Sequence, residues 1–253
     1  MPGDDLDLLL TTIREAGALA LAMRARGFGH KQKADGTFVT DVDFAVDALL
    51  KTQITSARPD DGWLSEETPD NPQRLAKSRL WIADPIDGTR GFLHGDGPWG
   101  IGMALTNARG VLCAAVFCPA DGRLYHAALG KGAFLNGAPI VTKPGSRRVI
   151  APRRFGTALK AAGLAPESHS SLPLLLRLAA VAEGDYAAAV STGDKNDWDI
   201  AAGQLLVSEA GGSVTRLDGT AIIYNQPQPW QPGLVAATDP AVHAAVREAA
   251  RGS

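Results

Sequence analysis

The sequence predicts an α+β protein in which helices pack on an antiparallel sheet, followed by a second, α/β layer. Three observations favour this class. Two amphipathic helical patterns open the chain, strand-like segments separated by short turns fill residues 99–128, and strands alternate with helices from about residue 147. Consecutive strands beside helices are typical of α+β folds, whereas alternation is typical of α/β layers. We therefore expect two halves, residues 1–146 and 147–253.

Composition and charge exclude several classes of protein. The 253 residues include 25 Lys+Arg and 27 Asp+Glu, and this net charge of −2 argues against binding a nucleic acid polymer through a broad basic face. No secretory signal is visible, and the uncharged run at residues 219–238 carries glutamines and prolines that lipid would not tolerate, so we expect a cytoplasmic protein. Cys113 and Cys118 lack metal-site spacing and are expected to be reduced.

Two helices are predicted before the sheet. Apolar residues from Leu6 to Ala20 recur at helical spacing, and Gly27 ends the pattern. Thr40 is suited to cap a second helix, because Asp43 follows three residues later in the first turn. Asp43 therefore has a structural task available to it.

Strands are predicted for the rest of the first half. The segments at residues 62–64 and 80–83 are buried strands, and the second ends at Asp84. Strands at residues 99–105, 111–117 and 123–128 are separated by turn sequences, so we expect one antiparallel sheet. In the second half we predict strands and helices in alternation. The strands are residues 149–151, residues 186–191 and a further pair after the second helix, and the helices are residues 172–183, 197–210 and 240–251.

The densest chemical signal directly follows the strand at residues 80–83. It is the sequence Asp84-Pro85-Ile86-Asp87-Gly88-Thr89. Pro85 fixes its own backbone and favours an extended Asp84, so Asp84 and Asp87 are able to converge across a tight turn. Two converging carboxylates repel each other unless a cation neutralises them or one is protonated, and a hard divalent ion is the natural partner.

The next two residues favour phosphate binding. Gly88 and Thr89 offer backbone N–H groups in a turn that opens a short helix. Asp-Gly also occurs at residues 35–36, 61–62, 121–122 and 218–219, where turn formation alone explains it. A turn needs neither the buried strand nor the Asp-Pro-Ile sequence, so we predict a site for metal and phosphate at residues 84–89.

Two further acidic segments are candidates to complete this site. Glu66 and Glu67 follow the strand at residues 62–64, and Asp199 follows Trp198 in the first turn of a predicted helix. Taken alone, Glu66 is typical of a surface residue and Asp199 of a helix-dipole partner. The residues alone leave open whether Glu66 and Asp199 join Asp84 and Asp87.

These segments, together with Glu209-Ala-Gly-Gly212 and the segments that begin at Lys33 and Gly132, resemble in order and spacing the inositol monophosphatase superfamily. Its members are metal-dependent, lithium-sensitive phosphatases. The resemblance spans nearly the whole chain. It implies a layered αβαβα sandwich of the inositol monophosphatase and fructose-1,6-bisphosphatase type. Members include monomers and dimers, so a homodimer is one of two expected states.

The resemblance also implies a role for each site residue. The implied ligands of two or three Mg²⁺ ions are Glu66, Asp84, the Ile86 carbonyl, Asp87 and Asp199. The Thr89 hydroxyl, oriented by Asp43, would position an attacking water whose pKa Mg²⁺ lowers, and Glu66 would also serve a third, weaker ion. The candidate contacts to the substrate are Gly88, Thr89, Lys195 and Asp199.

The resemblance leaves the phosphate ester open. Family members that act on inositol monophosphate carry a glutamate at about the place of Thr192. Other segments are similar to CysQ-type 3′(2′),5′-bisphosphate nucleotidases, which would convert adenosine 3′,5′-bisphosphate to AMP. Histidinol-phosphate phosphatases share Asp-Gly-Thr-Arg at residues 87–90. Lys195, Arg90 and Arg154 are candidates to bind a second phosphate.

Two functions of other classes are less consistent with the sequence. Residues 95–100 match G-x-G-x-x-G, but a predicted strand follows them and no βαβ unit surrounds them, which argues against a dinucleotide-binding protein. A non-catalytic regulator that binds metal or phosphate on the same fold would be expected to lack a ligand, Thr89 or Asp43, and none is missing. The predicted function is therefore hydrolysis of a small phosphorylated metabolite.

Overall fold

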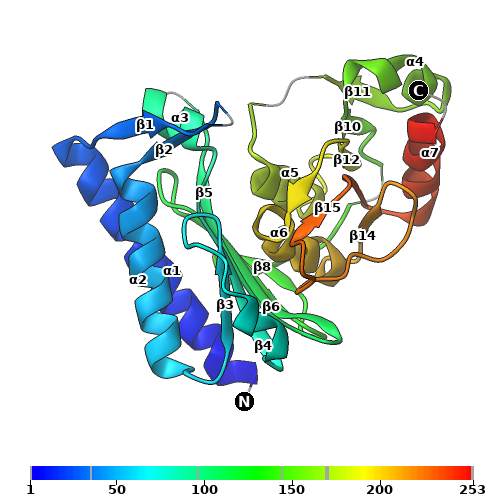
Figure 1. Ribbon diagram of the computed structural model, residues 1–253. Helices are drawn as coiled ribbons and strands as arrows, with labels where there is room; N and C mark the ends of the chain where they lie inside the picture. Colours follow the sequence, from blue (N-terminus) through cyan, green and yellow to red (C-terminus); the bar gives the residue numbers. More distant parts are fainter. Residues whose placement is uncertain (1, 35, 96, 144, 169–170, 252–253) are drawn as a thin grey trace.

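The computed structural model describes residues 2–34, 36–95, 97–143, 145–168 and 171–251. Asp35 of the predicted turn at residues 35–36 and Asp96 of the run at residues 95–100 lie outside this part. Helices and sheets stack in αβαβα order, which confirms the predicted architecture (Figure 1). Among the described helices, none combines the length and the apolar character needed to cross a membrane.

The helices form three layers. α1 and α2 cover one face of the larger sheet, α5 and α6 lie between the two sheets, and α4 and α7 cover the outer face of the smaller sheet (Figure 1). Their bounds, with two 3-10 helices, are α1 Pro2–Arg26, α2 Asp41–Ala57, η1 Pro72–Ala76, α3 Thr89–His94, η2 Arg153–Phe155, α4 Gly156–Ala161, α5 Leu174–Ala182, α6 Asp197–Glu209 and α7 Pro240–Arg251.

The start of α2 follows the predicted capping pattern. The Thr40 hydroxyl accepts hydrogen bonds from the N–H groups of Val42 and Asp43 at 3.1 and 3.3 Å. The Asp43 carboxylate accepts the Thr40 N–H at 2.9 Å in return. This reciprocal capping box satisfies N–H groups that have no partner within the helix.

The larger sheet has the strand order β3-β4-β5-β6-β7-β8-β9. β3 is parallel to β4, and all other neighbours are antiparallel, as predicted for the hairpins. The strands are β3 Gly62–Ser65, β4 Arg79–Asp87, β5 Gly100–Asn107, β6 Gly110–Cys118, β7 Arg123–Ala128, β8 Ala133–Leu135 and β9 Ala138–Ile140. A separate hairpin, β1 His30–Gln32 with β2 Phe38–Thr40, precedes α2.

The smaller sheet is mixed, with the order β11-β10-β12-β16-β14. β10 is parallel to both of its neighbours, and β16 is antiparallel to both of its own. The strands are β10 Arg148–Ile150, β11 Ala165–Glu167, β12 Ala188–Ser191, β14 Ser213–Arg216 and β16 Leu234–Ala237. A two-stranded ribbon, β13 Lys195–Asn196 with β15 Trp230–Gln231, leads into α6.

Several element boundaries differ from those predicted, and three of the differences bear on the site or its neighbours. β4 does not end at Asp84 but continues to Asp87, with irregular pairing between the two. α5 begins at Leu174 rather than residue 172, because Pro173 is extended and forms its N-cap. β12 begins at Ala188 rather than residue 186, because the chain is still leaving α5 at that point.

Candidate active site

Asp84 and Asp87 lie where β4 departs from regular pairing. Asp84 is opposite Gly102 and Asp87 is opposite Gly100, so β4 has one more residue between these pairs than β5 has. Asp84 is buried, and its Oδ1 accepts a hydrogen bond from the backbone N–H two residues later at 3.1 Å. Asp87 Oδ2 accepts the Leu175 N–H of α5 at 2.7 Å, which joins the strand end to the next layer.

Two glycines permit this arrangement. A Cβ at Gly102 would lie 2.3 Å from Leu175 Cδ1, so the Leu175 side chain of α5 fills the space that a side chain at residue 102 would need. Gly88 has a left-handed backbone with φ of 94° and is the N-cap of α3. A Cβ there would lie 2.8 Å from the Pro98 carbonyl oxygen and 2.7 Å from Pro173 Cγ, so only glycine is accommodated.

Thr89 and Asp43 meet at the start of α3. The Thr89 hydroxyl donates to the Ile86 carbonyl at 3.1 Å and lies 3.4 Å from Asp43 Oδ1. Asp43 is buried, and its other oxygen accepts the Thr40 hydroxyl at 2.5 Å. One carboxylate therefore caps α2 and holds the Thr89 hydroxyl at the same time.

Glu66 and Glu67 face a lysine from the hairpin that precedes α2. Lys33 Nζ donates to Glu66 at 2.9 Å and to Glu67 at 2.7 Å. Burial would lower the pKa of Lys33, but the hydrogen bonds and charges of the two glutamates raise it. Sequence reasoning quoted Lys33 as part of a motif without giving it a role, because its partners are more than thirty residues away in the sequence.

Asp199 reaches the same region from α6. It is the third residue of the helix, and its Oδ2 accepts the Asn196 N–H at 2.8 Å as part of a capping box. The predicted helix-end role is therefore present. The negative charge of Asp199 also raises the pKa of Asp84 and of Asp87, which places all three carboxylates in one electrostatic environment.

Burial and mutual repulsion shift the pKa values of the buried carboxyls upward. The pKa of Asp84 is raised well above its usual range by burial and by the charges of Glu66, Asp87, Asp199 and Asp43. Burial and the charge of Asp199 raise the pKa of Asp87 to about 8. Burial raises the pKa of Asp199 to about 6. Carboxyls in this state are stabilised as anions by a nearby cation.

The donors suit a hard cation, but they are not already arranged around one. Within the described residues, no three His, Cys, Asp or Glu side chains form a group that could hold a metal ion. Glu66 faces Lys33, and the Ile86 carbonyl accepts the Thr89 hydroxyl. Carboxylate and carbonyl oxygens are the ligands that Mg²⁺ prefers. The donor chemistry therefore matches magnesium.

The three predicted cations lie at different places. The charge of Lys195 in β13 lowers the pKa of Asp199, which shows that the two residues are close. The Lys195 Nζ itself donates to the Asp194 carbonyl at 3.0 Å. Arg90 is exposed on α3. Arg154 is exposed and lies 4.8 Å over the Phe155 ring. None of the three has a hydrogen bond to a predicted metal ligand in the described structure.

Arg177 of α5 is a further candidate to bind a second phosphate, and it was not predicted from the sequence. It lines a cavity of about 240 Å³ together with Pro152, Ser168, Thr192 and Gly193. Its Nε donates to the Leu172 carbonyl at 2.7 Å. Burial lowers the pKa of Arg177, whereas the charge of Asp87 raises it, so the two side chains interact electrostatically. A single arginine within the apolar residues of α5 was the available signal.

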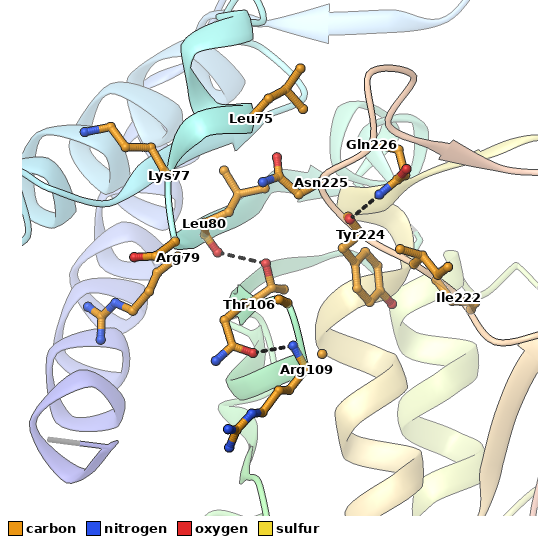
Figure 2. Close-up of a pocket in the computed structure, with 15 residues that line it drawn as sticks. Leu75, Lys77, Arg79, Leu80, Thr106, Arg109, Ile222, Tyr224, Asn225 and Gln226 are labelled. Carbon is orange, nitrogen blue, oxygen red and sulfur yellow. Dashed lines mark hydrogen bonds between the residues drawn. The ribbon is translucent and has the colours of Figure 1, made fainter.

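A larger cavity lies at the opposite end of β4. It has a volume of about 540 Å³ and is lined by Leu80, Thr106 and Tyr224, among others (Figure 2). Among the described residues around it, no acidic side chain is present, and the Arg79 guanidinium is paired with Asp5 and Asp61. This cavity therefore lacks the chemistry found around Asp84.

Comparison with known proteins identifies the family. The family profile named inositol monophosphatase matches residues 5–252. The chain belongs to the inositol monophosphatase family. It is therefore a phosphoric monoester hydrolase that acts on small phosphorylated substrates, and it belongs to a metal-dependent family.

Curated members of the family carry several activity names. An inositol-1-monophosphatase of Caulobacter vibrioides is 30% identical, over 81% of this chain and 88% of its own. A 3′-phosphoadenosine 5′-phosphate phosphatase of Mycobacterium leprae is 32% identical, over 76% of this chain and 75% of its own. A histidinol-phosphatase of Chlorobaculum parvum is 38% identical, but over only 54% of this chain and 52% of its own.

Solved structures of inositol monophosphatases share the fold. The IMPase of Thermotoga maritima is 26% identical and superposes with a TM-score of 0.80, covering 98% of this chain and 99% of its own. An IMPase/NADP phosphatase complexed with Mg²⁺ and phosphate is 21% identical, with a TM-score of 0.86 over 100% of this chain and 97% of its own. The αβαβα arrangement is thus that of the family.

Proposed function

We propose that the protein is a Mg²⁺-dependent phosphomonoesterase that hydrolyses its substrate by direct attack of water. The observation that carries the proposal is the set of carboxylates whose negative charges raise the pKa of Asp84. By itself, such a site would repel a phosphate anion. Bound Mg²⁺ would neutralise the carboxylates and the phosphate and would lower the pKa of a water molecule.

Residues of the chain itself would hold the reactants in place. The proposed metal ligands are Glu66, Asp84, the Ile86 carbonyl, Asp87 and Asp199. The Thr89 hydroxyl would orient the attacking water, with the Asp43 carboxylate 3.4 Å away as a neighbouring acceptor. The Gly88 and Thr89 N–H groups at the start of α3 would bind phosphate oxygens as negative charge shifts in the transition state.

Among phosphate esters we propose a 3′(2′),5′-bisphosphate nucleotide, with adenosine 3′,5′-bisphosphate hydrolysed to AMP. Arg177 supports this substrate, because it lines the cavity, interacts electrostatically with Asp87 and would supply a positive charge for a second phosphate. Thr192 lines the same cavity and has no carboxylate to accept hydrogen bonds from the hydroxyls of an inositol ring. Lys195, near Asp199, is a second candidate for the distal phosphate.

Two other monoesters are alternatives, each with its own support. Inositol 1-phosphate is supported by the Caulobacter relative, which aligns over most of both chains. Histidinol phosphate is supported by the Chlorobaculum relative and by Asp-Gly-Thr-Arg at residues 87–90. Neither substrate carries a second phosphate, so Arg177 distinguishes them from the bisphosphate.

The experiment is phosphate release from a panel of adenosine 3′,5′-bisphosphate, inositol 1-phosphate, histidinol phosphate and fructose 1,6-bisphosphate. We expect release with Mg²⁺, loss of release with EDTA and inhibition by millimolar Li⁺. Arg177→Met should raise KM about tenfold or more for the bisphosphate, because one charge-assisted contact is lost. Arg109→Met, an exposed residue at the far cavity, is the control. Absence of release from every ester would reject the proposed activity.

A further inference from the structure

Helix α2 presents two buried carboxylates, one helical turn apart. Asp43 contacts Thr40 and Thr89, as described above. Asp47, four residues later, is 6% exposed and has had no role so far. Residues at positions i and i+4 lie on the same face of a helix, so both carboxylates point from α2 toward the loops of the site.

The hydrogen bonds that Asp47 accepts come from a single loop. The Ser65 hydroxyl donates to Asp47 Oδ1, and the Thr68 hydroxyl donates to Asp47 Oδ2 at 2.5 Å. Within the described chain, Asp47 has no salt bridge to a basic side chain. A buried carboxylate without a cation is costly unless hydrogen bonds stabilise it, so these two hydroxyls determine where Asp47 can lie.

Ser65 and Thr68 stand on either side of the two glutamates. Ser65 is the last residue of β3, and its hydroxyl oxygen also accepts the Glu67 N–H at 3.4 Å. Asp47 thus anchors both ends of the segment at residues 65–68. Lys33 contacts the Glu66 side chain itself, whereas Asp47 fixes the backbone segment that carries it.

We infer that Asp47 is a positioning residue, which through Ser65 and Thr68 holds the loop that presents Glu66 and Glu67 to the acidic cluster. The inference rests on the proposed function in that it takes Glu66 to be a metal ligand. Groups that orient metal ligands typically contribute 10–100-fold to metal affinity or activity. α2 then sets the relative positions of two site loops, through Asp43 for Thr89 and through Asp47 for Glu66.

The test compares Thr68→Val with Thr68→Ser, and both with Asp47→Asn. The valine variant keeps the side-chain shape but removes the hydroxyl, whereas the serine variant keeps it. Binding of Mn²⁺ to the metal-free protein is measured by electron paramagnetic resonance. We expect Thr68→Val and Asp47→Asn to weaken binding about tenfold or more, and Thr68→Ser to stay within about twofold of wild type.

A matched control lies on the same helix. The Thr55 hydroxyl donates to the Lys51 carbonyl at 2.8 Å on the exposed side of α2, so Thr55→Val removes one hydroxyl hydrogen bond without touching the loop. It should leave Mn²⁺ binding unchanged. A urea titration of each variant reports its stability independently.

The outcomes separate this inference from the proposed function. If Thr68→Val and Asp47→Asn are less stable but bind Mn²⁺ as wild type does, Asp47 has only a structural role and the inference is wrong. If the wild type binds Mn²⁺ but hydrolyses no ester, the proposed activity fails, while the binding data still decide the role of Asp47.

Discussion

Each oxygen of the Asp43 carboxylate contacts a different part of the site. Oδ2 takes part in the capping box of α2, and Oδ1 lies 3.4 Å from the Thr89 hydroxyl. Burial raises the pKa of Asp43, whereas the Thr40 hydrogen bonds lower it, and the net shift is upward. Because the cap fixes the side chain, Thr89 meets an acceptor whose position is set by the helix itself.

This contact leads to a prediction about Thr89. Thr89→Val keeps the branched shape but removes the hydroxyl, so we expect kcat to fall by a factor of about 10²–10⁴, the range typical of a lost acid–base or orienting group. KM should change little, because in the proposed mechanism backbone N–H groups and metal would bind the phosphate. Steady-state kinetics at saturating Mg²⁺ measure both constants.

Thr89→Ser is the control, since it retains the hydroxyl, and it should keep most of the activity. If the valine variant keeps the kcat of wild type, Thr89 does not orient the attacking water. Thermal unfolding of both variants shows whether α3 still forms.

Several site residues could be predicted because their chemistry is local in the sequence. Asp84, Asp87 and Thr89 follow one buried strand, and Thr40 with Asp43 forms a capping pattern within four residues. Arg177 and Asp47 could not be predicted in this way. Their partners come from distant segments, and an isolated polar residue on a helix is more often solvent-facing.

At the scale of the element, α2 depends on its first turn. The Thr40 side chain is buried and satisfies two backbone N–H groups that have no partner in the helix. The helix then packs on β4 and on α1. A change in the first turn therefore affects both the packing of the helix and the direction of the Asp43 carboxylate.

We predict that Thr40→Ala lowers the free energy of unfolding by about 1 kcal/mol, as expected for loss of an N-cap. It should also lower kcat, because Asp43 loses the hydroxyl that fixes it. Urea denaturation and kinetics of the same variant measure the two effects. Thr52→Ala, at an exposed position of the same helix, is the matched control and should change neither by much. Unchanged stability in Thr40→Ala would contradict the capping role.

The longer elements were predictable, whereas several of the short ones were not. The hairpins from Gly100 to Ala128 were correctly assigned to one antiparallel sheet because turn residues separate clear apolar runs. β8, β9 and β11 are each three residues long, which is too short for a periodic pattern. The extension of β4 past Asp84 also escaped prediction, because Pro85 usually ends a strand.

At the scale of the whole molecule, hydrogen bonds join the two halves of the chain. Asp87 of the larger sheet accepts the Leu175 N–H of α5 at 2.7 Å. The Arg74 guanidinium donates to the Asn225 side chain, 151 residues later in the sequence, at 2.8 Å. We propose that residues 1–146 supply most of the metal ligands and that residues 147–253 supply Asp199 and the substrate contacts. The site would then require both halves.

A charged cluster far from the site leads to a prediction about pH. Asp5 of α1 is buried and accepts hydrogen bonds from Arg58 at 2.7 Å and Arg79 at 2.8 Å. Burial raises the pKa of Asp5, but the hydrogen bonds and charges of Arg58 and Arg79 together lower it by more. The pKa of Asp5 therefore lies below its usual 3.8. Asp5 therefore stabilises the fold above pH 3.8, and this contribution is lost as pH falls through the lowered pKa.

We expect Asp5→Asn to cost about 2 kcal/mol of unfolding free energy near neutral pH, as hydrogen bonds to a charged group are lost. The difference from wild type should shrink as pH falls below 3.8, where Asp5 is protonated in the unfolded state, and should be smallest below the lowered pKa of the folded state. Urea denaturation across this pH range measures it. Asp7→Asn, exposed on the same helix, should show little effect. A difference that is independent of pH would contradict the ion-pair explanation.

The extra residue in β4 makes chain length, as well as residue identity, important at the site. In a regular strand, side chains three positions apart point to opposite faces, but one added residue reverses this parity. Asp84 and Asp87 reach the same cluster for this reason. Deletion of Ile86 would therefore turn one aspartate away from the other although both remain in the chain. In comparisons among homologues, a one-residue gap in this segment would carry more functional weight than most substitutions there.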